Sequence, residues 1–123
     1  MSSALKNLSE FSTNNLPNIT GKRFAIVVSE WNTDVTHALY NGAYETLLKY
    51  GAAEKNIVSV QVPGSFELSL GAQKMAEKTE IYAVICLGCV IQGETRHFDF
   101  ICQAVADGIT NGGLKYNKPV IFA

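Results

Sequence analysis

Short apolar runs alternate with longer periodic segments along this chain. The runs are residues 24–28, 56–62, 81–87 and 118–123. Each is rich in apolar residues, and 24–28 is apolar throughout, which is typical of a strand buried on both faces of a sheet. Between the runs, apolar side chains recur three or four residues apart within 35–50, 68–76 and 98–109. This spacing predicts three amphipathic helices.

Capping residues suggest where these helices begin and end. Thr33 or Asp34 is the candidate N-cap of the first helix, and Gly51 follows its last apolar position. The third helix is predicted to close at Gly112 and Gly113. Small polar residues at the start and glycine at the end are the usual signals of helix boundaries.

The order β-α-β-α-β-α-β predicts an α/β fold, a flavodoxin-like three-layer αβα sandwich with a four-stranded parallel sheet. Right-handed crossovers in a doubly wound sheet place the first helix on one face and the other two on the opposite face. One face is then covered by a single helix. We expect either a segment after Ala123 or a partner to cover the remainder.

Residues 1–20 are polar and are predicted to form an N-terminal arm, with Phe11 and Leu16 spaced so that they could dock on another surface. Residues 21–123 are predicted to form a single α/β domain. The 123 residues and 13.4 kDa suit one domain.

The composition of the chain disfavours several classes of protein. Ten Lys and Arg balance eleven Asp and Glu, with a pI near 6.1, which disfavours a nucleic-acid binder that relies on a basic field. No apolar run approaches a membrane span, and the N-terminal residues lack the pattern of a signal peptide. We therefore expect a cytoplasmic protein. Charged residues make up only 17%, which suggests surface covered by identical subunits.

Three cysteines, Cys86, Cys89 and Cys102, cannot all pair within the chain. We expect reduced thiols, mostly buried. Cys86 and Cys89 have CxxC spacing, but no second Cys or His pair completes a zinc site, so no metal site is predicted.

Ligands of such sheets bind beyond the carboxyl ends of the strands, near the point where the strand order reverses. The junctions there are residues 29–33, 62–67 and 88–97. Trp31 could stack on a planar ligand or plug the core, and Phe66 is open to the same two interpretations. Glu67 could accept hydrogen bonds from ligand hydroxyl groups, or simply oppose the helix macrodipole.

The third junction contains Glu94 and Thr95 ahead of a helix, where free backbone N–H groups could bind an anion or Thr95 could merely cap the helix. It lacks the glycine patterns of nucleoside triphosphate and dinucleotide sites. His97, in the first helical turn, could transfer a proton or be structural.

Four segments, SEWN (29–32), VPGSFELS (62–69), LGCVIQGETRHFDF (87–100) and KPVIF (118–122), together resemble the 6,7-dimethyl-8-ribityllumazine synthase family of riboflavin biosynthesis. The resemblance runs from about residue 5 to the last residue. It implies condensation of 5-amino-6-(D-ribitylamino)uracil with 3,4-dihydroxy-2-butanone 4-phosphate, without a metal or redox cofactor.

The resemblance also implies roles for individual residues. Trp31 would stack on the pyrimidine, and Ser65, Phe66 and Glu67 would hold the uracil and ribityl chain. The backbone of Cys89, Val90 and Ile91 would read the uracil edge. Glu94 and Thr95 would bind phosphate, His97 would transfer protons, and Phe122 would reach a neighbour's site.

The family implies pentamers, sometimes paired or built into sixty-subunit shells, and riboflavin synthase as a possible partner. The arm could add a strand to a neighbouring sheet. Members usually continue past the KPVIF strand into helices that carry a phosphate-clamping Arg and a Lys. Arg96 lies in the wrong place to replace that Arg. The resemblance therefore implies a domain that is C-terminally incomplete, and a protein made of these 123 residues alone is predicted to have weak or absent catalysis and poor solubility.

Alternatives from other classes remain open at this point. One is a catalytically impaired assembly subunit or ligand-binding protein of the same fold. A phosphoacceptor receiver domain is disfavoured because, of its acidic residues and Lys at the strand ends, only Glu30 is present. A flavodoxin is disfavoured because Glu30, Trp31 and Asn32 do not form a Ser/Thr-rich phosphate loop.

Overall fold

A four-stranded parallel sheet forms the centre of the computed structural model, which describes residues 16–123. Its order is β2-β1-β3-β4. The strands are β1 (Arg23–Ser29), β2 (Ile57–Val62), β3 (Ile81–Leu87) and β4 (Val120–Phe122). The predicted α/β sandwich and its strands are confirmed. The last strand is shorter than expected because Pro119 has no N–H to donate to the ladder.

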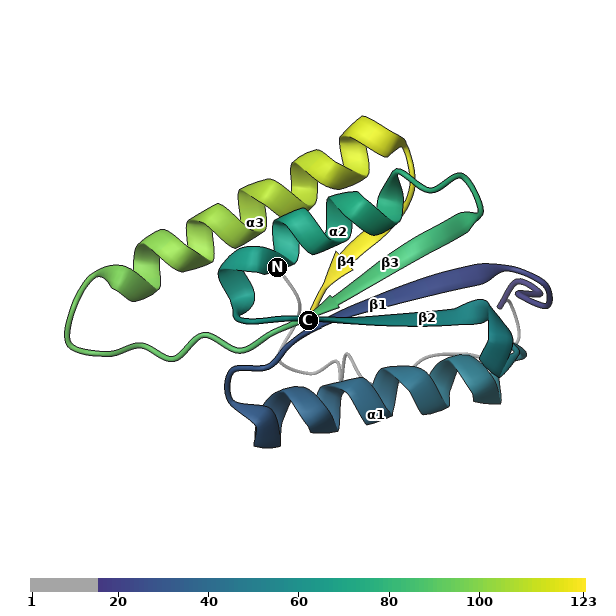
Figure 1. Cartoon of the computed structure of the whole chain (residues 1–123), viewed down its shortest axis with the longest axis horizontal. Helices are drawn as coiled ribbons and strands as arrows, with labels where there is room; N and C mark the ends of the chain where they lie inside the picture. The colour runs from purple at the N-terminus through teal and green to yellow at the C-terminus, as the bar shows by residue number, and fades with distance from the viewer. Residues whose placement is uncertain (1–15) are drawn as a thin grey trace, which may run out of the picture.

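Three helices cover the two faces of this sheet as the crossover rule predicts. Helix α1 (Thr33–Lys49) lies on one face, and α2 (Leu68–Ala76) and α3 (His97–Tyr116) lie side by side on the other (Figure 1). Two short 3-10 turns, η1 (Glu54–Asn56) and η2 (Ser65–Glu67), precede β2 and α2.

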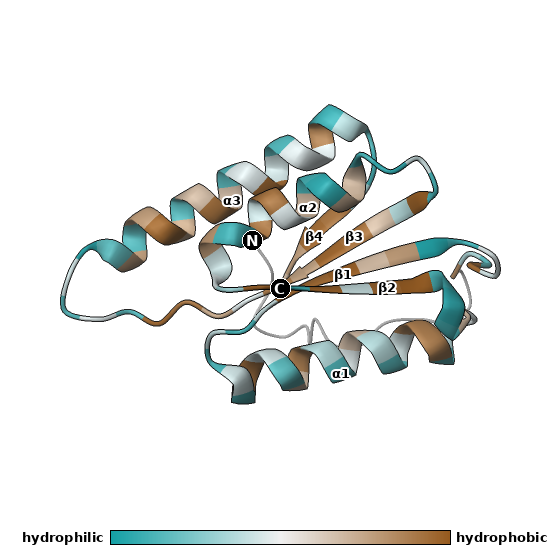
Figure 2. Cartoon of the chain, in the orientation of Figure 1, coloured by the Kyte–Doolittle hydropathy of each residue, from teal (hydrophilic) through white to brown (hydrophobic). Residues whose placement is uncertain are grey.

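The apolar strands supply most of the core, and Figure 2 shows them brown over most of their length. On the side of α2 and α3, Val27, Leu68, Val84 and Val105 are buried together. On the side of α1, three buried strand residues, Ile26, Val28 and Leu87, pack against half-buried helix residues, including Leu39, Ala43 and Leu47. The sheet is thus a rigid base for the loops at its carboxyl end.

The predicted cap of α1 is wrong. The N-cap is Asn32, whose left-handed backbone (φ 59°, ψ 59°) makes a sharp turn before the helix. Asparagine tolerates this conformation better than most residues. Thr33 instead donates its hydroxyl to the carbonyl of Glu30 at 3.0 Å. Gly51 follows the end of the helix, as predicted, with φ 115°.

The predicted end of α3 is also wrong, because the helix continues through Gly112 and Gly113 to Tyr116. A Cβ atom on Gly113 would lie 3.4 Å from the carbonyl oxygen of Lys118 and 3.7 Å from Cβ of Val120. This glycine therefore allows the return strand to approach the helix. Asn117, in the left-handed region at φ 52°, turns the chain.

The arm prediction for residues 1–20 falls mostly on residues 1–15, including Phe11, which lie outside the described residues. Within the described range, Ile19 packs against a small core cluster of Phe24, Ala52 and Ala83. No helix among residues 16–123 is long and apolar enough to cross a membrane.

Candidate active site

A cavity of about 620 Å³ lies at the carboxyl ends of β1, β2 and β3, where the strand order reverses. This is the place expected for a ligand of a doubly wound sheet. Its wall is formed by Trp31, Gly64, Ser65, Phe66, Glu67, Cys89, Val90, Ile91, His97 and Ile101. The wall contains every site residue predicted from the sequence except Glu94, Thr95 and Phe122.

Trp31 is held at the cavity by the backbone around it. The N–H of Glu30 donates to the carbonyl of Val62 at 2.8 Å, and the N–H of Trp31 donates to that of Pro63 at 3.2 Å. These bonds extend the β1–β2 pairing past the strand ends, and the turn at Asn32 follows directly. Trp31 remains 58% exposed, so it is not a core plug and offers an open aromatic face.

Phe66 and Glu67 lie on the short turn η2, which begins directly after Pro63 and Gly64. Phe66 is 60% exposed, so it too lies outside the core. Glu67 is half-buried, and its Oε1 atom accepts a hydrogen bond from the N–H of Gly64 at 3.1 Å. One carboxylate oxygen thus anchors the turn, which fixes the direction of the other.

Residues 88–96 connect β3 to α3 without regular secondary structure. Cys89 and Val90 are half-buried, and Ile91 is 59% exposed. The N–H of Gly88 still continues the pairing of β3 with β4, because it donates to the carbonyl of Ala123 at 3.1 Å, and residues 89–96 lie beyond the strand. The side chain of Ser65 reaches this segment and donates its hydroxyl to the carbonyl of Cys89 at 3.2 Å.

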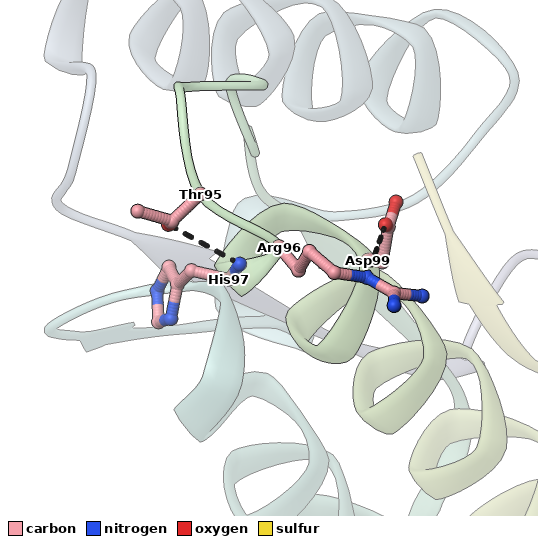
Figure 3. A network of polar contacts seen from close by, with 4 residues as sticks. All are labelled: Thr95, Arg96, His97 and Asp99. Carbon is pink, nitrogen blue, oxygen red and sulfur yellow. Dashed lines mark hydrogen bonds and ion pairs between the residues drawn. The ribbon is translucent and has the colours of Figure 1, made fainter.

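His97 is the first residue of α3 and lines the cavity. Its N–H donates to the hydroxyl of Thr95 at 3.4 Å, but the N-cap of α3 is Arg96, one residue after the predicted Thr95, and it makes no side-chain cap hydrogen bond. Figure 3 shows the imidazole pointing away from Arg96 and Asp99, which form an exposed ion pair at 3.9 Å. The imidazole is therefore separate from that pair and open to a ligand.

Three predicted residues do not line the cavity. Glu94 and Thr95 are exposed and precede α3, beside His97. Phe122 is 44% exposed on the edge strand β4. Its neighbour two positions back, Val120, packs against the core on the side of α2 and α3, and strand alternation places Phe122 on the same face.

Two wall residues were not predicted as site residues, Gly64 and Ile101. Ile101 follows His97 by four positions on α3, which places both on one face of the helix. That spacing is visible in the sequence, but an apolar residue at this position equally fits the apolar stripe that faces the core. Ile101 also packs against the core, and it adds an apolar side chain to the cavity wall that includes His97.

A second cavity of about 560 Å³ lies between α1 and the edge strand β2. Its lining includes Glu30, His37, Tyr40 and Gln61, and it contains none of the predicted site residues. Among residues 16–123, no group of three or more His, Cys, Asp or Glu side chains is placed to hold a metal ion.

The sequence comparisons match the chain to one family. A family model for 6,7-dimethyl-8-ribityllumazine synthase matches residues 21–123. Three proteins with that name, from Cytophaga hutchinsonii, Flavobacterium johnsoniae and Parabacteroides distasonis, are 62%, 50% and 48% identical to the chain over 122 residues. The matches cover 99% of this chain and 76%, 64% and 76% of those relatives.

Proposed function

Because the chain belongs to the 6,7-dimethyl-8-ribityllumazine synthase family, we propose that it catalyses the condensation expected from its sequence. The substrates are 5-amino-6-(D-ribitylamino)uracil and 3,4-dihydroxy-2-butanone 4-phosphate. The products are the lumazine, inorganic phosphate and water. The observation that carries the proposal is the single cavity in which Trp31, Glu67 and His97 meet.

The pyrimidine is proposed to bind among the aromatic side chains. Trp31 and Phe66 are both more than half exposed and line the same cavity, so either can cover a planar ring. The backbone of residues 89–91 would pair with the uracil edge. The oxygen of Glu67 that does not bind Gly64 would accept hydrogen bonds from the ribityl hydroxyl groups.

The reaction needs positioning and proton transfer more than a protein nucleophile. The 5-amino group attacks the ketone and an imine forms with loss of water. Phosphate then leaves by elimination, and the ribityl-bearing amine attacks the remaining carbonyl and closes the ring with loss of a second water. Holding both reactants in one cavity supplies much of the acceleration. We assign proton transfer to His97, whose imidazole faces the cavity.

The phosphate is proposed to lie at the start of α3, near Glu94 and Thr95. The first N–H groups of a helix have no partners within it and favour an anion. Thr95 already accepts a hydrogen bond from the N–H of His97, which orders this end of the helix. The same contact brings the proposed phosphate site next to the proton-transfer residue.

We further propose a homo-oligomer built on pentamers, in which the exposed Phe122 on the edge strand β4 reaches a neighbouring site. The family resemblance supports this arrangement and the addition of the N-terminal arm to a neighbouring sheet. Association with riboflavin synthase, a cytoplasmic location and the boundary between arm and domain at residue 20 stay predictions. No observation on residues 16–123 favours the alternative of an impaired assembly subunit.

The proposed activity is tested by incubating the purified protein with both substrates and following the lumazine by its absorbance and fluorescence. We expect turnover that depends on both substrates and continues in the presence of a chelator. Controls without protein are needed because the substrates are reactive. A rate equal to that of the uncatalysed reaction would contradict the proposed function.

The role of His97 is tested by His97→Ala, with His37→Ala as the matched control. His37 is exposed on α1 and lines only the second cavity. We expect His97→Ala to lower kcat by about a hundredfold, the lower range for general acid-base catalysis. His37→Ala should retain the parent kcat. Equal rates for both variants would remove the proton-transfer assignment.

A further inference from the structure

Three loops surround the proposed pyrimidine site, and different contacts connect them. Backbone hydrogen bonds join the loop after β1 to the loop after β2, through Glu30 and Trp31. A side chain, Ser65, joins the loop after β2 to the segment after β3. Ser65 is only 5% exposed, and its hydroxyl donates to the carbonyl of Cys89 at 3.2 Å.

Gly88 provides the space for this contact. A Cβ atom at this position would lie 2.6 Å from Oγ of Ser65 and 2.7 Å from Cδ1 of Leu68. Leu68 is fully buried and cannot easily move aside, so the hydroxyl of Ser65 is the group that must move. The backbone of Gly88 is itself held, because its N–H donates to the carbonyl of Ala123 at 3.1 Å. A side chain at residue 88 would therefore displace the Ser65 hydroxyl.

We propose that Ser65 is a positioning residue that acts through Cys89. Its hydroxyl holds the carbonyl of Cys89, with Gly88 as the necessary space, and so sets where the backbone of residues 89–91 lies relative to Trp31 and Phe66. This inference rests on the proposed function, which assigns that backbone to the uracil edge. Because the buried hydroxyl is already used within the protein, Ser65 influences the pyrimidine without donating to it.

The chemistry of this contact predicts a selective effect. Removing the hydroxyl leaves the carbonyl of Cys89 without this donor and frees the segment after β3 to move. The backbone that pairs with the pyrimidine edge is then displaced. The contact between Thr95 and His97 at the start of α3 is unchanged. The KM for the pyrimidine should rise, while the KM for the butanone phosphate and kcat change little.

The experiment compares Ser65→Ala with Ser29→Ala. Ser29 is a suitable control because it is 1% exposed at the end of β1, and its hydroxyl has no hydrogen-bond partner among the described residues. Hydrogen–deuterium exchange is measured on a peptide covering residues 88–96, and steady-state kinetics is measured for each substrate. Thermal unfolding of both variants reports any general loss of stability.

For Ser65→Ala we expect faster exchange in residues 88–96 and a rise of about tenfold in the pyrimidine KM, as for loss of one buried hydrogen bond. Ser29→Ala should match the parent in both measurements. Unchanged exchange at 88–96, or an equal rise in the KM of both substrates, would overturn the proposal. Absence of turnover in the parent protein would instead overturn the proposed function, and the exchange result would still test the Ser65–Cys89 contact.

A second substitution displaces the hydroxyl of Ser65 without removing it. Gly88→Ala places a methyl group against Ser65 and should raise exchange in residues 88–96, as Ser65→Ala does. The KM of Gly88→Ala for the pyrimidine should rise at least as much as that of Ser65→Ala. A folded Gly88→Ala protein with parent exchange and parent KM would contradict the role assigned to Gly88.

Discussion

At the scale of single residues, three side chains in or beside the candidate site each make one hydrogen bond within the protein. Glu67 accepts from the N–H of Gly64, Thr95 accepts from that of His97, and Ser65 donates to the carbonyl of Cys89. Each bond orders a loop residue that would otherwise be free to change rotamer. Ordered side chains lose less entropy when a ligand binds, so these contacts prepare the cavity for binding.

Cys86 gives a prediction about pH at this scale. The side chain is fully buried on β3, and desolvation raises the pKa of its thiol to about 12. The thiolate is the reactive form, so Cys86 should resist alkylation in the folded protein between pH 7 and 9. Peptide mass spectrometry after iodoacetamide treatment measures this. The same treatment in denaturant should label all three cysteines, and rapid native labelling of Cys86 would contradict its burial.

The same shift affects folding stability with a definite sign. An unfolded thiol has a pKa of about 8.5, so above that pH the unfolded state releases a proton that folded Cys86 keeps. The contribution to stability is therefore fully present below about pH 8.5 and is lost as the pH rises toward 12. Urea unfolding of the parent and of Cys86→Ala should show a steeper alkaline loss for the parent.

Asn32 gives a second prediction at this scale. Its φ of 59° is unfavourable for β-branched residues, and the turn it makes follows Trp31 directly. Asn32→Gly should keep the free energy of unfolding within about 0.5 kcal/mol, and Asn32→Val should lower it by about 1–2 kcal/mol. Chemical denaturation of both variants gives the comparison. Equal stability would show that the left-handed turn is not required.

At the scale of elements, the two helical layers pack differently on the sheet. Helix α2 approaches closely, and four of its nine residues, Leu68, Gly71, Ala72 and Ala76, are buried. Helix α1 has seventeen residues and only Thr36 is buried. The close layer positions the turn η2 and its cavity residues, because η2 continues directly into α2.

Substitutions at two helix glycines test how closely each helix approaches the sheet. A Cβ atom on Gly71 of α2 would lie 2.7 Å from Cγ1 of Val27, whereas one on Gly42 of α1 would meet nothing within 4 Å. Gly71→Ala should lower the free energy of unfolding by about 1–3 kcal/mol through overpacking. Gly42→Ala should raise it by about 0.5–1 kcal/mol because alanine favours the helix. Thermal unfolding measures both, and a stabilised Gly71→Ala protein would contradict the close approach.

At the scale of the whole molecule, one sheet face is covered by α1 alone among the described elements (Figure 1). Ile121 on β4 is 52% exposed, and Tyr82 on β3 is 46% exposed. Large apolar side chains also lie open on the opposite layer, with Leu70 at 60% and Phe100 at 66%. Exposed apolar area of this kind is typical of surfaces that bind another protein.

This distribution leads to a prediction about assembly. We expect light scattering or sedimentation to give a mass several times the 13.4 kDa of one chain, and a multiple of five chains if the pentamer proposal holds. Phe122→Ala should lower catalysis without changing the cavity of its own subunit, since Phe122 does not line it. A monomer with full activity would contradict both the assembly and the shared site.

Much of the fold and of the cavity could be predicted from the sequence. The third strand was placed at its observed bounds, Ile81–Leu87, because a run buried on both faces stands out from its polar surroundings. The start of α1 and the end of α3 were misplaced. The N-cap of α1 is Asn32, in the left-handed region, and not Thr33 or Asp34. Gly113 does not end α3, because its lack of a side chain allows β4 to pack closely against the helix.

The sequence by itself determined the parallel sheet, the side on which each helix lies and the junctions that carry the site, because apolar periodicity and crossover handedness leave few alternatives. Only the tertiary structure decided which junction residues share the cavity and what each side chain does there. Ser65 turns its hydroxyl to Cys89, Trp31 stays open, and Ile101 joins His97 in the wall. The Ser65–Cys89 contact joins loops that lie far apart in the chain, and the close packing around it depends on differences in distance of a few tenths of an ångström, which a pattern of residue types does not encode.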